Sequence, residues 1–131
     1  MIQRIQSIFL LIAALLCVAF LFVPSLEIND LYLIAKNNIV LAILAGLSAL
    51  ISFANIFLFK NRVLQMNVVK LSFLVILGLI GFAVYTELSD GDFAPNIVGA
   101  ALPILSLIFN VLAIRFIKKD DQLVRSMDRL R

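Results

Sequence analysis

The sequence predicts an all-α integral membrane protein with four transmembrane helices. Both termini are expected in the cytoplasm, and the C-terminus is expected to form a cytoplasmic amphipathic helix. Three observations predict this class. Apolar residues make up 63% of the chain and charged residues 15%, against about half and about a quarter in a soluble domain. The apolar residues are concentrated in long runs, and the basic residues fall almost entirely on one side of the membrane that these runs imply.

The four apolar runs define the expected helices. Charged residues are absent from Ile5–Leu26, Asn37–Phe59, Leu71–Thr86 and Phe93–Ile114. A hydrocarbon core of ~30 Å needs about 20 helical residues, so the third run must recruit Val68, Val69 and the stem of Lys70. The sequence therefore predicts a transmembrane bundle over residues 1–116, with helices at about 5–26, 37–59, 68–88 and 93–116. Residues 117–131 are expected to form a cytoplasmic, mixed-charge helical tail, and the fourth helix can continue into it because no glycine or proline follows Pro103.

The first helix is expected to be retained rather than cleaved. Its apolar run is long for a signal peptide, and it ends without a small-residue cleavage motif. The chain has one cysteine, Cys17, and no histidine. Disulfide frameworks and the commonest metal sites are therefore excluded within one chain, and we expect Cys17 to be a packing residue and the protein to use no cofactor.

Basic residues fix the expected orientation, because lysine and arginine concentrate on the cytoplasmic side of membrane proteins. With the N-terminus inside, only Lys36 lies outside. The other ten are then cytoplasmic: Arg4, Lys60, Arg62, Lys70, Arg115, Lys118, Lys119, Arg125, Arg129 and Arg131. The sequence therefore predicts a multi-pass protein of a bacterial inner membrane with both termini in the cytoplasm.

The two outer loops have different turn signals. Pro24–Asn38 alternates apolar and polar residues before Asn29-Asp30, which is compatible with a small hairpin. In the second loop, Asp90-Gly91 indicates a turn, Asp92 is a candidate cap of the fourth helix, and Pro95 is expected in its first turn.

Small residues mark candidate contact faces between helices. Gly46 belongs to a stripe of alanine and serine residues on the second helix, and Gly78 and Gly81 lie on the third. Membrane helices associate through close packing, which small residues permit. These faces are expected either to pack inside the bundle or to dock the protein onto another membrane subunit.

Four polar residues are expected within the membrane, near its cytoplasmic side: Asn55, Lys70, Ser72 and Asn110. Asn55 and Asn110 come to nearly the same depth on helices that run the same way, so an interhelical bond between the two amides is one interpretation. Lys70 would then extend to the lipid headgroups. The other interpretation is a binding site open to the cytoplasm. No ionisable residue falls near the bilayer centre, which counts against an ion-coupled transporter.

The last fifteen residues, "IKKDDQLVRSMDRLR", hold eight charged residues. Their apolar positions gather on one side at helical period, and Asp121 and Arg125 stand four apart. Such a segment can act as a basic anchor on anionic lipid. Its interleaved aspartates and apolar stripe favour binding to a protein or ribosomal surface equally well. The candidate partner-binding residues are Lys118, Lys119, Leu123, Arg125, Met127, Arg129, Leu130 and Arg131.

The opening "MIQRIQSIFLLIAALL" and the closing "IKKDDQLVRSMDRLR" resemble a family of small four-helix inner-membrane proteins from Bacteroidota that is classed as a domain of unknown function. The resemblance extends from end to end, although the middle of the chain matches mainly in hydropathy. It implies a bacterial inner-membrane location and brings no activity or catalytic residue.

The expected function is that of a non-catalytic accessory or scaffold subunit in a larger inner-membrane complex. The sequence has no phosphate-binding glycine loop and no nucleophile beside a base, so we expect no enzyme activity. Other membrane subunits and anionic lipids are the expected partners, and DNA is not. A protein translocation or insertion assembly, with the ribosome or translocon as partner, is the narrower hypothesis. The alternative is a small oligomeric carrier or channel whose site faces the cytoplasm.

Overall fold

The computed structural model describes residues 2–28, 31–34, 38–89 and 97–130. Four long helices make up most of it: α1 (Ile2–Phe22), α2 (Ile39–Phe57), α3 (Arg62–Ser89) and α4 (Ile97–Arg129). A short 3₁₀ helix, η2 (Leu58–Lys60), joins α2 to α3. Each of the four long helices is long and apolar enough to cross a membrane. The prediction of a multi-pass, four-helix membrane protein is therefore confirmed.

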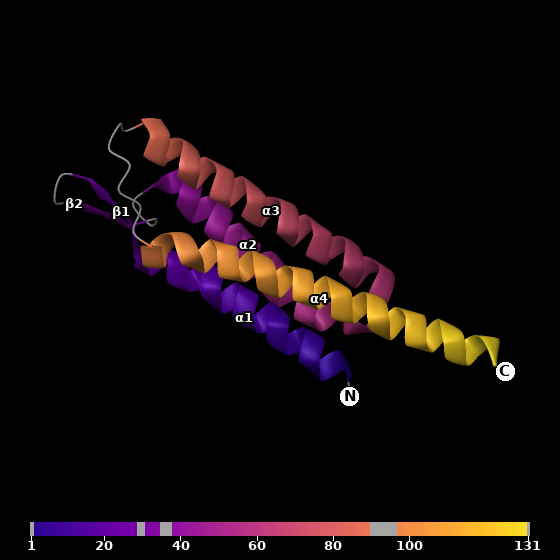
Figure 1. Ribbon diagram of the computed structural model, residues 1–131. Coiled ribbons are helices and arrows are strands. Elements are labelled where there is room, and N and C mark those ends of the chain that lie inside the picture. The colour runs from indigo at the N-terminus through magenta and orange to yellow at the C-terminus, as the bar shows by residue number, and fades with distance from the viewer. Residues whose placement is uncertain (1, 29–30, 35–37, 90–96, 131) are drawn as a thin grey trace.

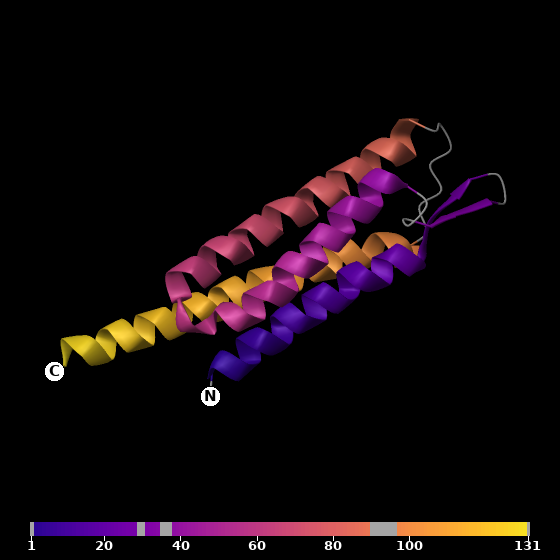
Figure 2. The same cartoon turned by 180° about the vertical axis from the view of Figure 1, so that it is seen from behind.

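The four helices lie side by side and pack in a ring (Figures 1 and 2). Each packs against the next in sequence, and α1 closes the ring against α4. Helices α1 and α3 are thus diagonal to each other, as are α2 and α4. One end of the bundle holds the start of α1, the end of α4 and η2, and we name it the terminal end. The opposite end carries a pair of strands and is named the hairpin end.

The hairpin end contains a strand pair that the sequence indicated. β1 (Pro24–Ile28) pairs antiparallel with β2 (Leu31–Ile34), with a register shift between Pro24 and Leu26. Helix α1 therefore ends at Phe22, short of the expected end at 26, because Pro24 cannot continue the helical hydrogen bonds. Strand β1 also contacts α4. The predicted turn at Asn29-Asp30, and the predicted features at Asp90-Gly91, Asp92 and Pro95, lie outside the described residues.

One helix boundary at the terminal end also differs from the expected one. Helix α3 begins at Arg62 rather than near 68, because the side chain of Asn61 accepts a hydrogen bond from the Leu64 amide (3.3 Å) and so caps the helix. Helix α4 passes the expected bundle boundary of 116 without a break, as the absence of glycine and proline after Pro103 allows. It continues to Arg129 as one helix that contains Pro103.

The core consists of three apolar clusters along the bundle axis. Phe20, Leu41, Ala45 and Leu79 form the cluster at the hairpin end. Cys17, Ala49 and Ile76 form the middle one. Leu10, Val69, Ala113 and Ile117 form the cluster at the terminal end. Large apolar side chains also cover the outer surface of the helices, as expected where they face lipid.

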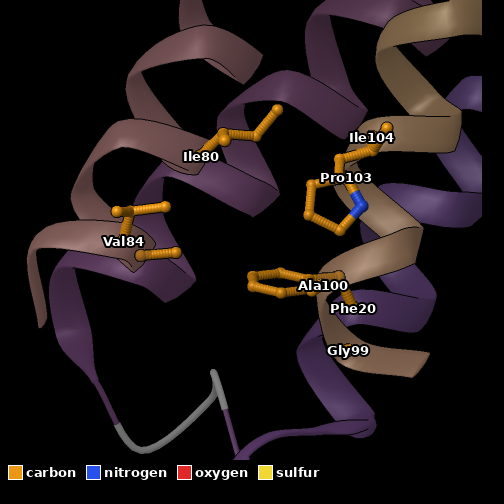
Figure 3. Close-up of a pocket in the computed structure, with 8 residues that line it drawn as sticks. Phe20, Ile80, Val84, Gly99, Ala100, Pro103 and Ile104 are labelled. Carbon is orange, nitrogen blue, oxygen red and sulfur yellow. The ribbon is translucent and has the colours of Figure 1, made fainter. Parts of the chain in front are cut away.

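An apolar cavity of about 80 Å³ lies beside the hairpin-end cluster. Figure 3 shows Phe20 of α1 and Pro103 of α4 on one side of it, opposite Ile80 and Val84 of α3. Proline has no N–H, so Pro103 donates no hydrogen bond to the Gly99 carbonyl one turn earlier. The cavity thus lies beside a point of α4 where one helical hydrogen bond is absent.

Candidate functional site

Neutral polar side chains are unusually frequent in the interior of the bundle. Among the described residues, the buried polar set comprises Gln6, Ser48, Ser52, Asn55, Gln65, Ser72, Ser106 and Asn110. They come from all four helices. Buried polar groups are favourable only when they are hydrogen-bonded, and more so in lipid than in water. The hydrogen-bond partner of each side chain therefore shows which polar atoms hold helices together and which remain available to bind a ligand.

Helices α1 and α4 are joined by hydrogen bonds at two levels. The Gln6 side chain donates to the Phe116 carbonyl (3.1 Å) near the terminal end. Deeper in the bundle, the Ser106 hydroxyl donates to the Ala13 carbonyl (3.0 Å), and Cys17 Sγ lies 3.1 Å from the same hydroxyl. Cys17 is thus a hydrogen-bonding residue as well as the packing residue that was expected.

Helices α2 and α3 are joined in a similar way. The Ser52 and Ser72 hydroxyls form a buried hydrogen bond of 2.8 Å. One to two turns nearer the terminal end, the Gln65 side chain donates to the Asn55 carbonyl at 3.5 Å. Ser72, which the sequence predicted as a packing residue, therefore links two helices.

The two asparagines do not form the predicted bond with each other. Both are fully buried. Asn110 Nδ2 donates to the Ser106 carbonyl of its own helix (3.2 Å). Asn110 Oδ1 and both polar side-chain atoms of Asn55 have no hydrogen-bond partner among the described residues. Lys70, by contrast, is exposed on the outside of α3, so it does not share the interior with the asparagines.

Sequence reasoning missed Gln6, Gln65, Ser48 and Ser106 as interior residues, although a signal was present. Ser48, Ser52 and Asn55 are spaced by four and three. Ser106 and Asn110 are four apart, and Gln65 and Ser72 are seven apart. Such spacings place the members of each set on one face of a helix.

The glycines predicted as contact residues lie away from this interior. Gly78 and Gly81 are exposed and Gly46 is half-buried. A methyl group built on any of the three would meet no neighbouring atom within 4 Å. Alanine and serine on α2 and α4 provide the close packing inside the bundle instead. The two α3 glycines thus leave a shallow strip on the outer surface.

An ion pair fixes α4 where it leaves the bundle. The Arg62 guanidinium, at the start of α3, lies 3.4 Å from the Asp120 carboxylate and also donates to the Asp120 carbonyl at 3.5 Å. Both side chains are largely buried. One turn later, Arg125 pairs with Asp121 at 3.0 Å. A cavity of about 190 Å³ lies here, lined by Arg62, Val63, Met66, Asn67, Ile117, Asp121 and Arg125. Since each of the two arginines pairs with an aspartate, the net charge around this cavity is close to zero.

Beyond Asp121 every described residue of α4 is exposed. This segment, residues 122–130, includes the apolar residues Leu123, Val124, Met127 and Leu130, with Met127 68% and Leu130 89% exposed. Lys118, Lys119, Arg125 and Arg129 are exposed as well, and Arg131 lies outside the described residues. Figures 1 and 2 show the end of α4 continuing past the other three helices.

Comparison with curated proteins and with solved structures found no match. Comparison with protein families gave one over almost the whole chain, at residues 2–130. The matching family is described as a domain of unknown function, DUF4293. The resemblance stated above to an uncharacterised family is thereby confirmed, and the chain belongs to the DUF4293 family.

Proposed function

We propose that this protein is a non-catalytic accessory or scaffold subunit of a larger bacterial inner-membrane complex, with the exposed end of α4 as its docking element in the cytoplasm. The observation that carries the proposal is the continuation of α4 to Arg129. Its 33 residues span ~50 Å at ~1.5 Å per residue, whereas the hydrocarbon core is ~30 Å thick.

The direction of this segment favours a protein partner over the lipid surface. An interfacial helix lies in the plane of the membrane, with its apolar face in the headgroups. Here α4 stays one helix, and the pair between Arg62 and Asp120 holds it in line with the bundle. Leu123, Met127 and Leu130 remain uncovered, and a helix in line with the bundle would carry the last of them past the headgroups, because the whole bilayer is about 40–45 Å thick. The occupant that fits is a protein with an apolar groove edged by acidic side chains, complementary to Lys118, Lys119 and Arg129.

The outer strip at Gly78 and Gly81 suits a second contact, with a transmembrane helix of the same complex. Helices approach closely in lipid where small residues face each other, and both glycines have open space in front of them. A protein translocation or insertion assembly is the narrower candidate for the complex, because a basic cytoplasmic helix fits machinery that works near ribosomes. The alternative of an oligomeric carrier keeps the two buried asparagines as its site and loses Lys70, which is exposed.

Purification in mild detergent tests the proposal. A tag on the N-terminus would be used with the full chain and with a chain truncated after Lys119, followed by quantitative mass spectrometry. We expect the full chain to recover a reproducible set of inner-membrane proteins, and the truncated chain to bind that set at least about a hundredfold more weakly, which corresponds to about 2.8 kcal/mol of binding free energy. Recovery of the chain alone in several detergents, or an undiminished set after truncation, would refute the proposal.

The proposed orientation, with both termini in the cytoplasm, follows from the distribution of basic residues. Single cysteines at Ser25, Ser89 and Ser126 in a Cys17→Ala background check it. In cells with a permeabilised outer membrane, we expect a membrane-impermeant thiol reagent to label the cysteines at Ser25 and Ser89. The cysteine at Ser126 should react only after the inner membrane is opened. Labelling at Ser126 in closed cells would reverse the orientation.

A further inference from the structure

Among the residues that the structure describes, three buried polar atoms have no hydrogen-bond partner: Asn55 Oδ1, Asn55 Nδ2 and Asn110 Oδ1. Both side chains have no exposed surface. An amide that is buried without hydrogen bonds is unfavourable, and native structures rarely keep one. Two such amides on different helices indicate that one bound molecule satisfies the hydrogen bonds of both.

The two amides come to the same level of the bundle. The terminal-end cluster joins Val69 of α3 to Ala113 of α4, and Ile56 of α2 packs against it. Ile56 directly follows Asn55, and Ala113 lies three residues after Asn110. Both asparagines therefore lie within about one turn of the same cluster. Since α2 and α4 are diagonal in the ring, their buried side chains approach the bundle axis from opposite sides.

The surroundings determine which chemical class of molecule fits between them. Every buried polar side chain among the described residues is neutral. A charged ligand would have no opposite charge in the interior to offset its desolvation. The free atoms are two acceptor oxygens and one amide donor. A fitting molecule must donate two hydrogen bonds and accept one, and water meets that requirement with the three bonds that are typical of buried water.

We propose that Asn55 and Asn110 form a binding site for a water molecule, which donates to the two Oδ1 atoms and accepts from Asn55 Nδ2. Polar residues continue from this site in both directions. Gln6 and Gln65 lie toward the terminal end, and Ser52, Ser72 and Ser106 lie toward the middle of the bundle.

The interior site shares no residue with the proposed docking segment, which begins at Lys118, so either proposal can fail without the other.

The sole cysteine provides a reporter for the bound molecule. Cys17 Sγ lies 3.1 Å from the Ser106 hydroxyl, and the carbonyl of Ser106 accepts from Asn110 Nδ2. Cys17 is only 2% exposed, so bulk solvent does not reach it. Hydroxyl radicals produced from bound water by an X-ray pulse would oxidise this readily oxidised side chain. The probe is the full-length protein in bicelles, exposed to the pulse in buffered water.

We expect Cys17 to be oxidised despite its burial. The double variant Asn55→Leu/Asn110→Leu should lower the oxidation of Cys17 several-fold. Ser48→Ala is the matched control, because it removes a buried hydroxyl that bonds only within its own helix, and it should leave the oxidation unchanged. An unoxidised Cys17 in the unaltered protein would overturn the proposal without any variant being needed.

A stability cycle over the same positions adds a second measurement. If both asparagines bind one molecule, the effects of Asn55→Leu and Asn110→Leu should be non-additive, because either change abolishes the shared site. Additive effects would contradict a shared site. Coupling in the cycle without oxidation of Cys17 would indicate a direct bond between the two amides, which also overturns the proposal.

Discussion

Phe20→Ala is expected to destabilise the folded bundle by about 2–3 kcal/mol. Phe20 is 1% exposed and belongs to the hairpin-end cluster with Leu41, Ala45 and Leu79. Its loss would enlarge the adjacent cavity, now about 80 Å³, and such cavities cost packing energy that the neighbours do not recover. The value is below the ~3–5 kcal/mol for Phe→Ala in soluble cores, because the side chain contacts apolar lipid in the unfolded state as well.

Phe22→Ala is the matched control, since Phe22 lies two residues along the same helix and is 64% exposed. It should change stability by less than about 0.5 kcal/mol. Reversible unfolding in mixed micelles, with a rising fraction of SDS, would measure both variants. Equal losses of stability at the two positions would contradict the burial of Phe20 and the exposure of Phe22.

Replacing Leu123, Met127 and Leu130 with serine is expected to release the docking partner. These side chains are exposed on one side of α4, and serine removes their apolar surface without altering the net charge. Burial of a Leu or Met side chain in an interface contributes about 1.5–3 kcal/mol, so the loss of three should weaken binding by at least about a hundredfold. Co-purification with the tagged protein, and complementation of a deletion strain, would measure this.

The arginines test whether charge contributes to the same contact. Changing Arg125 and Arg129 to glutamine should slow association and weaken binding to a smaller degree, because charges at the rim of an interface mainly steer the encounter. Gln122→Ala is the silent control, since it removes neither an apolar side chain nor a charge. If the apolar variant bound as well as the unaltered protein, a plain basic anchor would be the better account of this segment.

Hydropathy was sufficient to predict the four spans, because a membrane requires long apolar helices whatever their packing. It could not show which side of each helix faces inward. Helix α3 illustrates this: Ile76 and Leu79 are buried, whereas Leu74, Leu77 and both glycines are exposed. In water the outward residues would be polar and would reveal the face. In lipid both faces are apolar, so the sequence offers only the rare polar residues as markers.

Those markers predicted part of the candidate site. Asn55, Ser72 and Asn110 were recognised by their depth, and all three are buried. Lys70 was grouped with them because depth alone does not distinguish directions around a helix. Ser72 lies two positions after Lys70, which is a rotation of about 200°, and this places the lysine outside and the serine inside. The pair between Arg62 and Asp120 joins residues 58 positions apart, and only the path of α3 and α4 brings them together.

Because α4 continues unbroken past Asp120, it fixes how far the apolar stripe lies from the bundle and which way the stripe faces around the helix axis. Ten residues separate Asp120 from Leu130, which gives a stand-off of ~15 Å between the last ion pair with the bundle and the tip of the apolar stripe. Each residue also turns the helix by about 100°, so one added residue near Asp121 would swing the stripe to another side. A partner that docked on this segment would therefore be held at one height above the ion pair and at one direction around the axis of α4.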